Sequence, residues 1–425
     1  MSQQKKQKGQ RSILRDSLSL VGSGGVVQVV AFLLLPIISH LYAPDLLGIL
    51  GLFTSVSGVL SIASGGRYEQ AIVTSSGKPD RQPLLWLTLL INAAFFVVTF
   101  FLALLLRNGF LPGKYVALNP YLLLLPLTIF SMGVYNTLSA NDLSRGNFPS
   151  LAIAKTAQGL GNNLLKILFA VVLGASVGGL IGALLCSYAM GIVCLLQGCR
   201  TASIPSWGEL RTVAKAYSAF PRFGIVQSGI DYLLGSLLVL LLPQQFGMQE
   251  IGWITMAIML ASRPLQVISD GVSGVYFHRT SEMVNARHPL MPMVKTFLYR
   301  WFLVATPLAL LLFFLLPWMV GILLEATYAP TAKIIRLMLP MLLFRVPCTI
   351  FNILPDVLRK QRTHMWIQIG LLVGQLGVLS FSLYYGLSFA ELLLFYYGSV
   401  TLLLVSYGIW LLYITKQYDR TNIYS

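Results

Sequence analysis

The feature that most limits what this chain can fold into is a series of about twelve apolar stretches, each about 20 residues long. A stretch of that length can cross the hydrocarbon of a bilayer as a helix, which satisfies its own backbone hydrogen bonds. We therefore expect an all-α polytopic membrane protein. The predicted spans are residues 17–39, 46–66, 83–106, 119–140, 151–173, 177–198, 222–242, 250–276, 297–317, 333–354, 365–386 and 390–413.

The composition excludes an ordinary soluble protein. Of the 425 residues, 56% are hydrophobic and only 10% are charged, with a mean hydropathy of +0.75. Soluble domains carry about 25% charged residues. The basic segment 1–16 precedes an apolar run that is longer than the core of a signal peptide and lacks a small-residue cleavage pattern, so we expect an uncleaved first span.

Lys and Arg residues are concentrated in alternate connections, which predicts the orientation of the chain. Positive residues favour the cytoplasmic side, so both termini are expected in the cytoplasm. The net charge of +16 is spread over many loops, which argues against a nucleic-acid partner. The connections of the favoured side hold Lys5, Lys6, Lys8, Arg11, Arg15, Lys78, Arg81, Arg145, Lys155, Arg200, Arg211, Lys215, Arg222, Arg279, Arg287, Lys295, Arg300, Arg359, Lys360, Arg362, Lys416 and Arg420.

Neither the cysteines nor the histidines indicate a metal site or a disulfide framework. The cysteines show no CxxC spacing, and the histidines lie near predicted membrane boundaries. We assign no catalytic residue and no metal ligand.

The chain divides into two similar halves. Residues 41–50 resemble residues 245–254, and each segment follows the first span of its half as a tight turn that enters the next helix. We expect two six-helix lobes around a central cavity. The predicted parts are a tail 1–16, a lobe 17–199, a linker 200–217, a lobe 218–413 and a tail 414–425.

Charged residues inside the spans are the candidates for function, because burying them in lipid is costly unless they face protein or water. Cations outnumber anions six to three, which favours an anionic ligand. Lys155, Asn162 and Lys166 lie at i, i+7 and i+11 and form a polar stripe on one helix face. Interhelical hydrogen bonds and ion pairs are the structural alternative to a ligand site. The other candidates are Gln28, Arg67, Glu69, Asp231, Arg263, Asp270, Lys333, Arg336 and Arg345.

Two of these positions have specific local contexts. Pro264 follows Arg263 and is expected to kink or break its span. Asp270, seven residues later, could face the same way and pair with Arg263. Arg67 with Glu69 stands at the end of the second span, where a long cationic side chain can also extend to the interface.

Several segments together resemble a known family, in order and spacing along the scaffold. They are residues 41–50, the Arg67-Tyr68-Glu69-Gln70-Ala71-Ile72 segment, the Lys215–Pro221 entry to the seventh span, and the stretch from Pro317 to Pro340. Over nearly its whole length the chain is similar to the Wzx-type polysaccharide flippases of the multidrug/oligosaccharidyl-lipid/polysaccharide exporter (MOP) superfamily.

The resemblance implies transport without covalent chemistry or a cofactor. Undecaprenyl-pyrophosphate-linked oligosaccharides would cross the bacterial inner membrane for O-antigen or capsule assembly, by alternating access of a cationic cavity. Coupling to H⁺, to Na⁺ or to the membrane potential stays open. Expected partners are membrane lipids, a polysaccharide polymerase and a chain-length regulator. Substrate would be bound by Gln28, Arg67, Lys155, Asn162, Lys166, Arg263 and Arg345, with Glu69, Asp231 and Asp270 as coupling or ion-pair residues.

Two other functions are alternatives. A cation-coupled multidrug exporter on the same scaffold should be rich in deep acidic residues, and only Asp231 and Asp270 are of this kind. A membrane-integral glycan polymerase or ligase should carry a substantial outer loop with acidic, Arg or His residues. The predicted outer connections are short and contain no HExxH-like pattern.

Overall fold

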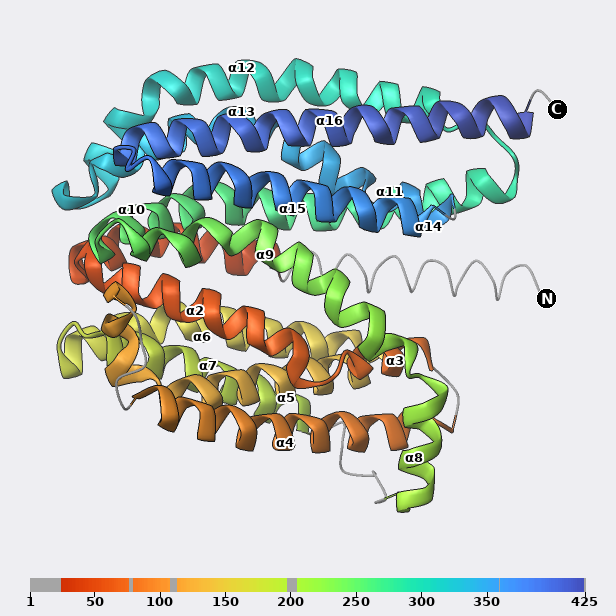
Figure 1. Cartoon of the computed structure of the whole chain (residues 1–425), viewed down its shortest axis with the longest axis horizontal. Coiled ribbons are helices and arrows are strands. Elements are labelled where there is room, and N and C mark those ends of the chain that lie inside the picture. Colours follow the sequence, from red (N-terminus) through yellow and green to blue (C-terminus); the bar gives the residue numbers. More distant parts are fainter. Residues whose placement is uncertain (1–23, 76–78, 108–112, 197–204, 359, 424–425) are drawn as a thin grey trace. The chain divides into compact units, whose positions relative to one another are not determined.

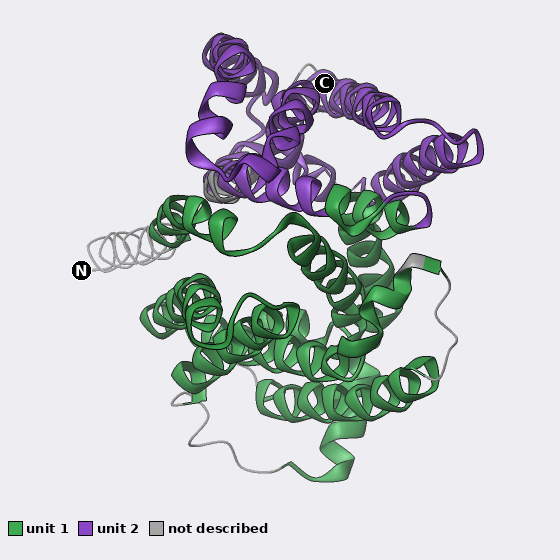
Figure 2. Ribbon diagram, turned by 90° about the vertical axis from the view of Figure 1, so that its left-hand side faces the viewer, with its two compact units in different colours: residues 1–243, 247–251 green, residues 244–246, 252–425 purple. Residues whose placement is uncertain are grey.

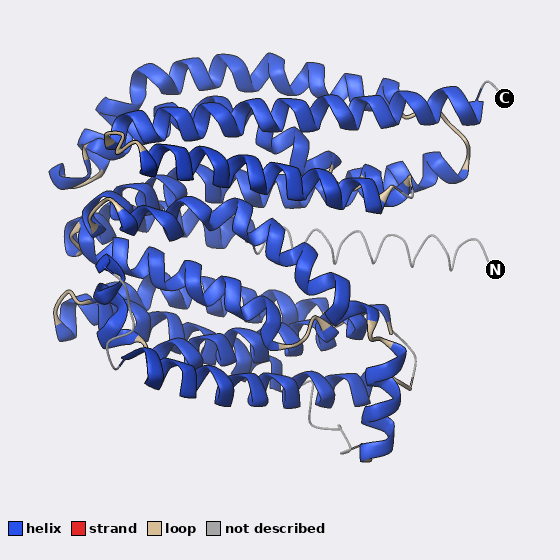
Figure 3. Cartoon of the chain, in the orientation of Figure 1, coloured by secondary structure: helices blue, strands red, loops and turns tan. Residues whose placement is uncertain are grey.

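The structure is a computed structural model that describes residues 24–75, 79–107, 113–196, 205–358 and 360–423. Within these ranges every regular element is a helix (Figures 1 and 3). This confirms the predicted all-α class. The predicted N-terminal tail, residues 17–23 of the first span, and Lys78, Arg200 and Arg359 lie outside the described residues.

Ten of the described helices are long and apolar enough to cross a membrane, or eleven if one bent pair counts as a single span. The bent pair joins Tyr115–Tyr121 to Leu124–Ser144 at 75°. The chain is therefore a multi-pass membrane protein. The predicted span 250–276 is not one of these helices. It falls on α10 (Met248–Ala257), a π-helical turn (Ile258–Ser262) and α11 (Arg263–Asn285).

The helices form two compact units, coloured separately in Figure 2. Unit 1 comprises residues 1–243 and 247–251, and unit 2 comprises residues 244–246 and 252–425. The helices of unit 1 are the first helix (Gly24–Leu41), α2 (Pro44–Ser64), α3 (Tyr68–Thr74), α4 (Arg81–Arg107), a 3₁₀ helix (Gly113–Tyr121), α5 (Leu124–Ser144), α6 (Phe148–Leu173), α7 (Val177–Leu196), α8 (Trp207–Ala216), a π-helical turn (Phe220–Gly224), α9 (Ile225–Leu241) and most of a 3₁₀ turn (Leu242–Gln244).

Helix α9 belongs to unit 1 by its contacts, although it follows the predicted linker. It packs against α2, where Gly58 leaves room for the Tyr232 ring: a Cβ at this position would overlap the phenol. The Tyr232 hydroxyl donates to the Thr54 carbonyl at 3.3 Å. The predicted linker itself contains α8, which begins with a capping box between Ser206 and Glu209. The two six-helix lobes with a boundary at 200–217 remain a prediction.

Unit 2 contains most of α10, the following π-helical turn, α11, α12 (Met291–Leu323), a short 3₁₀ turn (Ala326–Tyr328), α13 (Pro330–Phe351), α14 (Leu354–Val357), α15 (Gln361–Tyr384) and α16 (Phe389–Ile423). Its core is a cluster of buried residues that includes Val294, Phe351, Tyr407 and Leu411. The Asp419 carboxylate accepts the backbone N–H groups of Leu290 and Met291 at 2.8 and 2.9 Å. The end of α16 thus holds the start of α12.

Prolines inside α12 and α13 leave backbone carbonyls without their helical N–H partner, and side chains from the neighbouring helix take that place. Pro317 frees the Phe313 carbonyl, which accepts from Arg336 Nε at 2.6 Å. Pro347 frees the Leu343 carbonyl, which accepts from Trp301 Nε1 at 2.9 Å. Because a bare carbonyl is costly in an apolar environment, these two bonds stabilise the pairing of α12 with α13.

The repeated turn motif enters a helix in both halves, as predicted. Helix α2 begins at Pro44 and α10 begins at Met248, at equivalent positions of the motif. The aromatic residue before each helix packs inside its own unit. The Tyr42 hydroxyl donates to the Lys166 carbonyl at 2.7 Å, and the Phe246 ring lies edge-on to Phe389 with centroids 5.3 Å apart.

Candidate functional site

The polar stripe predicted on residues 155–166 lies along α6 and becomes more buried towards its C-terminal end. Lys155 is exposed, Asn162 is half-buried and Lys166 is only 5% exposed. The Oδ1 atom of Asn162 is buried and has no hydrogen-bond partner within the described structure. The C-terminal end of the stripe is therefore part of the protein interior and is not a solvated face.

The first helix covers this face of α6. A Cβ on Gly159 would overlap the Val27 side chain, so glycine is needed for the close approach of the two helices. Gln28 follows Val27 and is half-buried. The structure therefore places the Gln28 segment next to the stripe, and both belong to unit 1.

Unit 2 holds a second group of candidates around Arg345 of α13. The side chains close enough to interact electrostatically with Arg345 are Tyr396 and Tyr397 of α16 and the predicted candidate Arg263. Arg345 is exposed, whereas the two tyrosines are 5% and 4% exposed. The Tyr396 hydroxyl donates to Gln375 Oε1 of α15 at 3.2 Å. Two arginines thus share one neighbourhood with hydroxyl and amide groups, which suits a ligand with both phosphate and sugar.

Arg263 occupies the first position of α11, directly after the π-helical turn at Ile258–Ser262. Pro264 comes next, and the break in the regular helix here confirms the predicted kink or break. The Asp270 side chain lies outside the described part of the structure, so the predicted pairing with Arg263 stays a prediction. Asp231 is exposed on α9 in the other unit.

The third group is the corner between α2, α3 and α9, where Arg67 and Glu69 meet. Gly66 and Arg67 adopt left-handed conformations, with φ of 62° and 59°, and form the turn between α2 and α3. Arg67 Nη1 lies 3.2 Å from Glu69 Oε1, and Nη2 donates to the Ser228 hydroxyl of α9. Both side chains are at most 20% exposed. The charge of Arg67 is therefore compensated inside unit 1.

Sequence reasoning based on charge missed several polar residues that complete these groups. Asn92, in the middle of α4, is 1% exposed. Its side chain and that of Glu69 both border Gly65, next to Arg67. Tyr396 and Tyr397 interact electrostatically with Arg345, and Gln375 accepts a hydrogen bond from Tyr396. The signal was present for Asn92, because an amide in the apolar middle of a spanning helix requires a buried partner.

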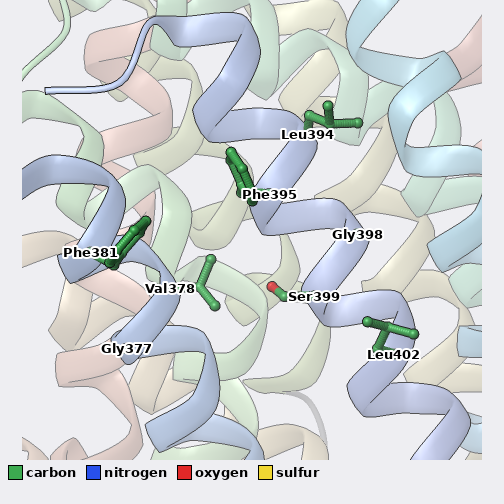
Figure 4. Close-up of a pocket in the computed structure, with 8 residues that line it drawn as sticks. All are labelled: Gly377, Val378, Phe381, Leu394, Phe395, Gly398, Ser399 and Leu402. Atoms are coloured by element: carbon green, nitrogen blue, oxygen red, sulfur yellow. The ribbon is translucent and has the colours of Figure 1, made fainter. Parts of the chain in front are cut away.

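An apolar groove of about 420 Å³ runs between α15 and α16 (Figure 4). Its lining includes the half-exposed Phe381 and Phe395, and two glycines widen it. The Ser399 hydroxyl in its wall already donates to the Tyr396 carbonyl at 2.8 Å. The groove contains no cation and is not the predicted ligand site. Hydrocarbon chains can fill such a surface.

Among the residues that the structure describes, no group of three or more His, Cys, Asp and Glu could hold a metal ion. His364 is 2% exposed, accepts or donates at the Tyr407 hydroxyl at 2.9 Å, and stacks on Tyr407 and Trp410. This histidine holds α15 to α16 in the core of unit 2.

Comparison with known proteins identifies the scaffold. Residues 37–333 match the family model described as polysaccharide biosynthesis protein. Among solved structures, the chain is similar to an inward-facing multidrug resistance MATE family transporter of the MOP superfamily, with a TM-score of 0.73, 15% identity and coverage of 95% of this chain and 99% of that one. No curated protein matches.

Two further solved structures show the same fold. An outward-facing MATE family transporter of the MOP superfamily has a TM-score of 0.61 and 15% identity over 96% of both chains. A MOP superfamily transporter from Pyrococcus furiosus has a TM-score of 0.63 and 15% identity, also over 96% of both chains. The fold is therefore that of the MOP superfamily MATE transporters, as the sequence resemblance implies.

Proposed function

Because the chain belongs to the polysaccharide biosynthesis protein family, we propose that it is a flippase for undecaprenyl-pyrophosphate-linked oligosaccharides. It moves these units from the cytoplasmic to the outer leaflet of the bacterial inner membrane, for assembly of O-antigen, capsule or a similar surface polysaccharide. No bond is made or broken, so the protein is a transporter and not a polymerase or ligase.

The observation that carries the proposal is that Arg345 lies within electrostatic range of a second arginine, Arg263, and of Tyr396 and Tyr397. Two guanidinium groups repel each other unless an anion lies between them, and no acidic side chain interacts with either among the described residues. A pyrophosphate supplies that anion and gains charge-assisted hydrogen bonds that offset its lost hydration. The tyrosine hydroxyls and Gln375 offer hydrogen bonds to the first sugar.

Alternating access explains how such a head group crosses the membrane. The glycan and pyrophosphate need a polar route, while the polyprenyl tail can stay in lipid. We place both termini in the cytoplasm from the distribution of Lys and Arg. The driving force is an H⁺ gradient, an Na⁺ gradient or the membrane potential. Membrane lipids, a polysaccharide polymerase and a chain-length regulator are the proposed partners.

A cation-coupled multidrug exporter is the second candidate, since two of the structural neighbours are named multidrug resistance transporters. The sign of the intramembrane charge separates the two functions. An exporter of cationic drugs needs acidic residues where this chain places Arg263 and Arg345. For the Pyrococcus furiosus transporter, a reversed polarity of the binding pocket likewise suggests a different function.

The test is translocation of a fluorescent oligosaccharide linked to polyprenyl pyrophosphate, in proteoliposomes that contain the full chain. We expect the protein to move label from the inner to the outer leaflet, where a membrane-impermeant quencher reaches it, much faster than this happens in protein-free liposomes. Transport of lipophilic cations in the same vesicles, without movement of the labelled lipid, would favour the exporter instead.

Lys166→Ala tests the α6 stripe in this assay. Removing the buried ammonium should reduce glycan translocation while membrane abundance stays at the wild-type level. Lys215→Ala, which removes an exposed cation of α8, is the matched control and should transport normally. Normal transport by Lys166→Ala at normal abundance would remove Lys166 from the site.

A further inference from the structure

The corner at Gly65 contains oxygen atoms that the ion pair of Arg67 and Glu69 does not use. Glu69 Oε1 faces Arg67, but Glu69 Oε2 is buried and has no hydrogen-bond partner among the described residues. A carboxylate oxygen left bare in this way costs free energy that a bound cation or proton would recover. The ion pair alone does not account for this geometry.

A second bare acceptor lies close by, on another helix. Asn92 of α4 is 1% exposed, and its Nδ2 donates to the Thr88 carbonyl at 3.1 Å and to the Thr137 hydroxyl at 3.3 Å. These two hydrogen bonds fix the orientation of the amide. Asn92 Oδ1 then remains buried without a partner in the described structure.

Two glycines border these side chains. A Cβ on Gly65 would lie 2.8 Å from Glu69 Oε2 and 3.5 Å from Asn92 Nδ2, so both side chains border the same point of the backbone. A Cβ on Gly133 of α5 would overlap Asn92 Oδ1 and lie 2.7 Å from Ser64 Oγ. The Ser64 hydroxyl donates to the Ser61 carbonyl, which leaves its oxygen as an acceptor.

We propose that Glu69, Asn92 and Ser64 form a binding site for a small monovalent cation, a proton or a sodium ion, that is linked to the conformation of Arg67. The inference rests on the proposed function, in which an ion gradient drives transport. A cation on Glu69 weakens the hold of the carboxylate on Arg67. Arg67 also binds Ser228, so occupancy of the site is communicated to α9.

The electrostatic surroundings agree with this assignment. Burial raises the pKa of Glu69 above its ordinary value, against the opposing effects of a backbone N–H and of Arg67. Asn92, Thr88 and Thr137, the groups that α4 and α5 bring to the corner, carry no charge. The charged or titratable side chains on α2, α3, α4, α5, α9 and the turn before α9 are Asp45, Tyr68, Glu69, Arg81, Arg107, Tyr135, Asp142, Arg222, Asp231 and Tyr232, with Arg67 between α2 and α3. Of these, Arg67 is the one that interacts with Glu69.

The test measures the thermal unfolding temperature of the purified full chain in detergent, so it does not depend on transport. One arm raises NaCl against choline chloride at constant ionic strength and pH 8. The other lowers the pH in choline chloride alone. A cation that binds the folded state raises the unfolding temperature. We expect wild type to respond in at least one arm, and the arm that responds identifies the cation.

Glu69→Gln should abolish the response, because it removes the charge while keeping the shape. Glu391→Gln is the matched control. This exposed carboxylate at the start of α16 accepts the backbone N–H and the hydroxyl of Ser388, and its loss should leave the cation response intact. Asn92→Ala serves as the second variant and should raise the cation concentration for half-maximal response at least about tenfold.

Two results would overturn the site: a wild-type protein that responds to neither cation, or a Glu69→Gln protein that responds as wild type does. Cation-dependent stabilisation without glycan translocation would reject the proposed function and keep the site. Glycan translocation without a cation response would reject the cation site and keep the proposed function.

Discussion

Arg67 of unit 1 and Arg345 of unit 2 are both arginines, but the charges around them differ. Arg67 has Glu69 at 3.2 Å and a hydroxyl partner on α9. Arg345 has a second arginine and two tyrosines for neighbours. A charge that is neutralised within its own unit stabilises the local structure, whereas an uncompensated one is ready to bind an anion. Intramembrane charge therefore indicates a ligand site only where compensation is missing.

The largest expected effect is on transport by Arg345→Ala. Losing a charge-assisted contact to phosphate should slow glycan translocation about 10- to 100-fold, with little change in unfolding temperature. Lys333→Ala on the same helix removes an exposed cation and provides the control. If both variants translocate glycan at the wild-type rate, the contrast between Arg345 and Arg67 loses its functional meaning.

Arg67→Ala should show the opposite pattern, a loss of stability. The Glu69 carboxylate would remain in a mostly buried position without its partner, which we expect to cost about 2 kcal/mol. Chemical denaturation of the purified protein measures this. The double variant Arg67→Ala with Glu69→Gln should recover part of the loss, since no unpaired charge is left. Equal stability of the single and double variants would contradict the pairing.

Arg336 sharpens the comparison as a third case, because its partner is a backbone carbonyl freed by Pro317. Arg336→Leu should destabilise the protein by about 1 kcal/mol and leave glycan translocation unchanged. In a Pro317→Ala background the new N–H satisfies the Phe313 carbonyl, so the same substitution should cost much less. A double-mutant cycle in unfolding free energy measures the difference. Additive effects would show that Arg336 does not serve the proline-freed carbonyl.

The smallest expected effect concerns pH and Glu69. Its raised pKa means that the folded protein keeps this proton to higher pH than the unfolded chain, so the folded state binds more protons in that interval. Stability should therefore fall as pH rises from the ordinary carboxyl pKa through the raised one. Glu69→Gln should flatten the unfolding temperature over this interval, and a slope that persists would assign the effect to another group.

The fold was largely predictable from sequence because lipid permits so few architectures. Runs of apolar residues had to be helices, and Pro264 marked the irregular turn in the predicted span 250–276. The packing of α9 with unit 1 was not predictable, since it depends on the fit of Tyr232 over Gly58.

The candidate sites were predictable only in part. A charged residue is conspicuous in an apolar sequence. The sequence therefore predicted four candidate site residues by their charge, namely Arg67, Lys166, Arg263 and Arg345. What neutralises each one depends on helix packing and was not readable from spacing. The adjacent Glu69 was the exception, because a partner two residues away needs no tertiary information.

The assignment of α9 to unit 1 has a practical consequence for dissecting the molecule. The polar segment containing α8 looks like the natural place to cut or tag the chain, but a cut there would separate α9 from the α2 surface that it covers. Residues 244–247, where the contact pattern changes, are the better place to divide the gene for co-expression of two fragments. Reporter insertions in this short stretch should leave each fragment with its own hydrophobic interior intact.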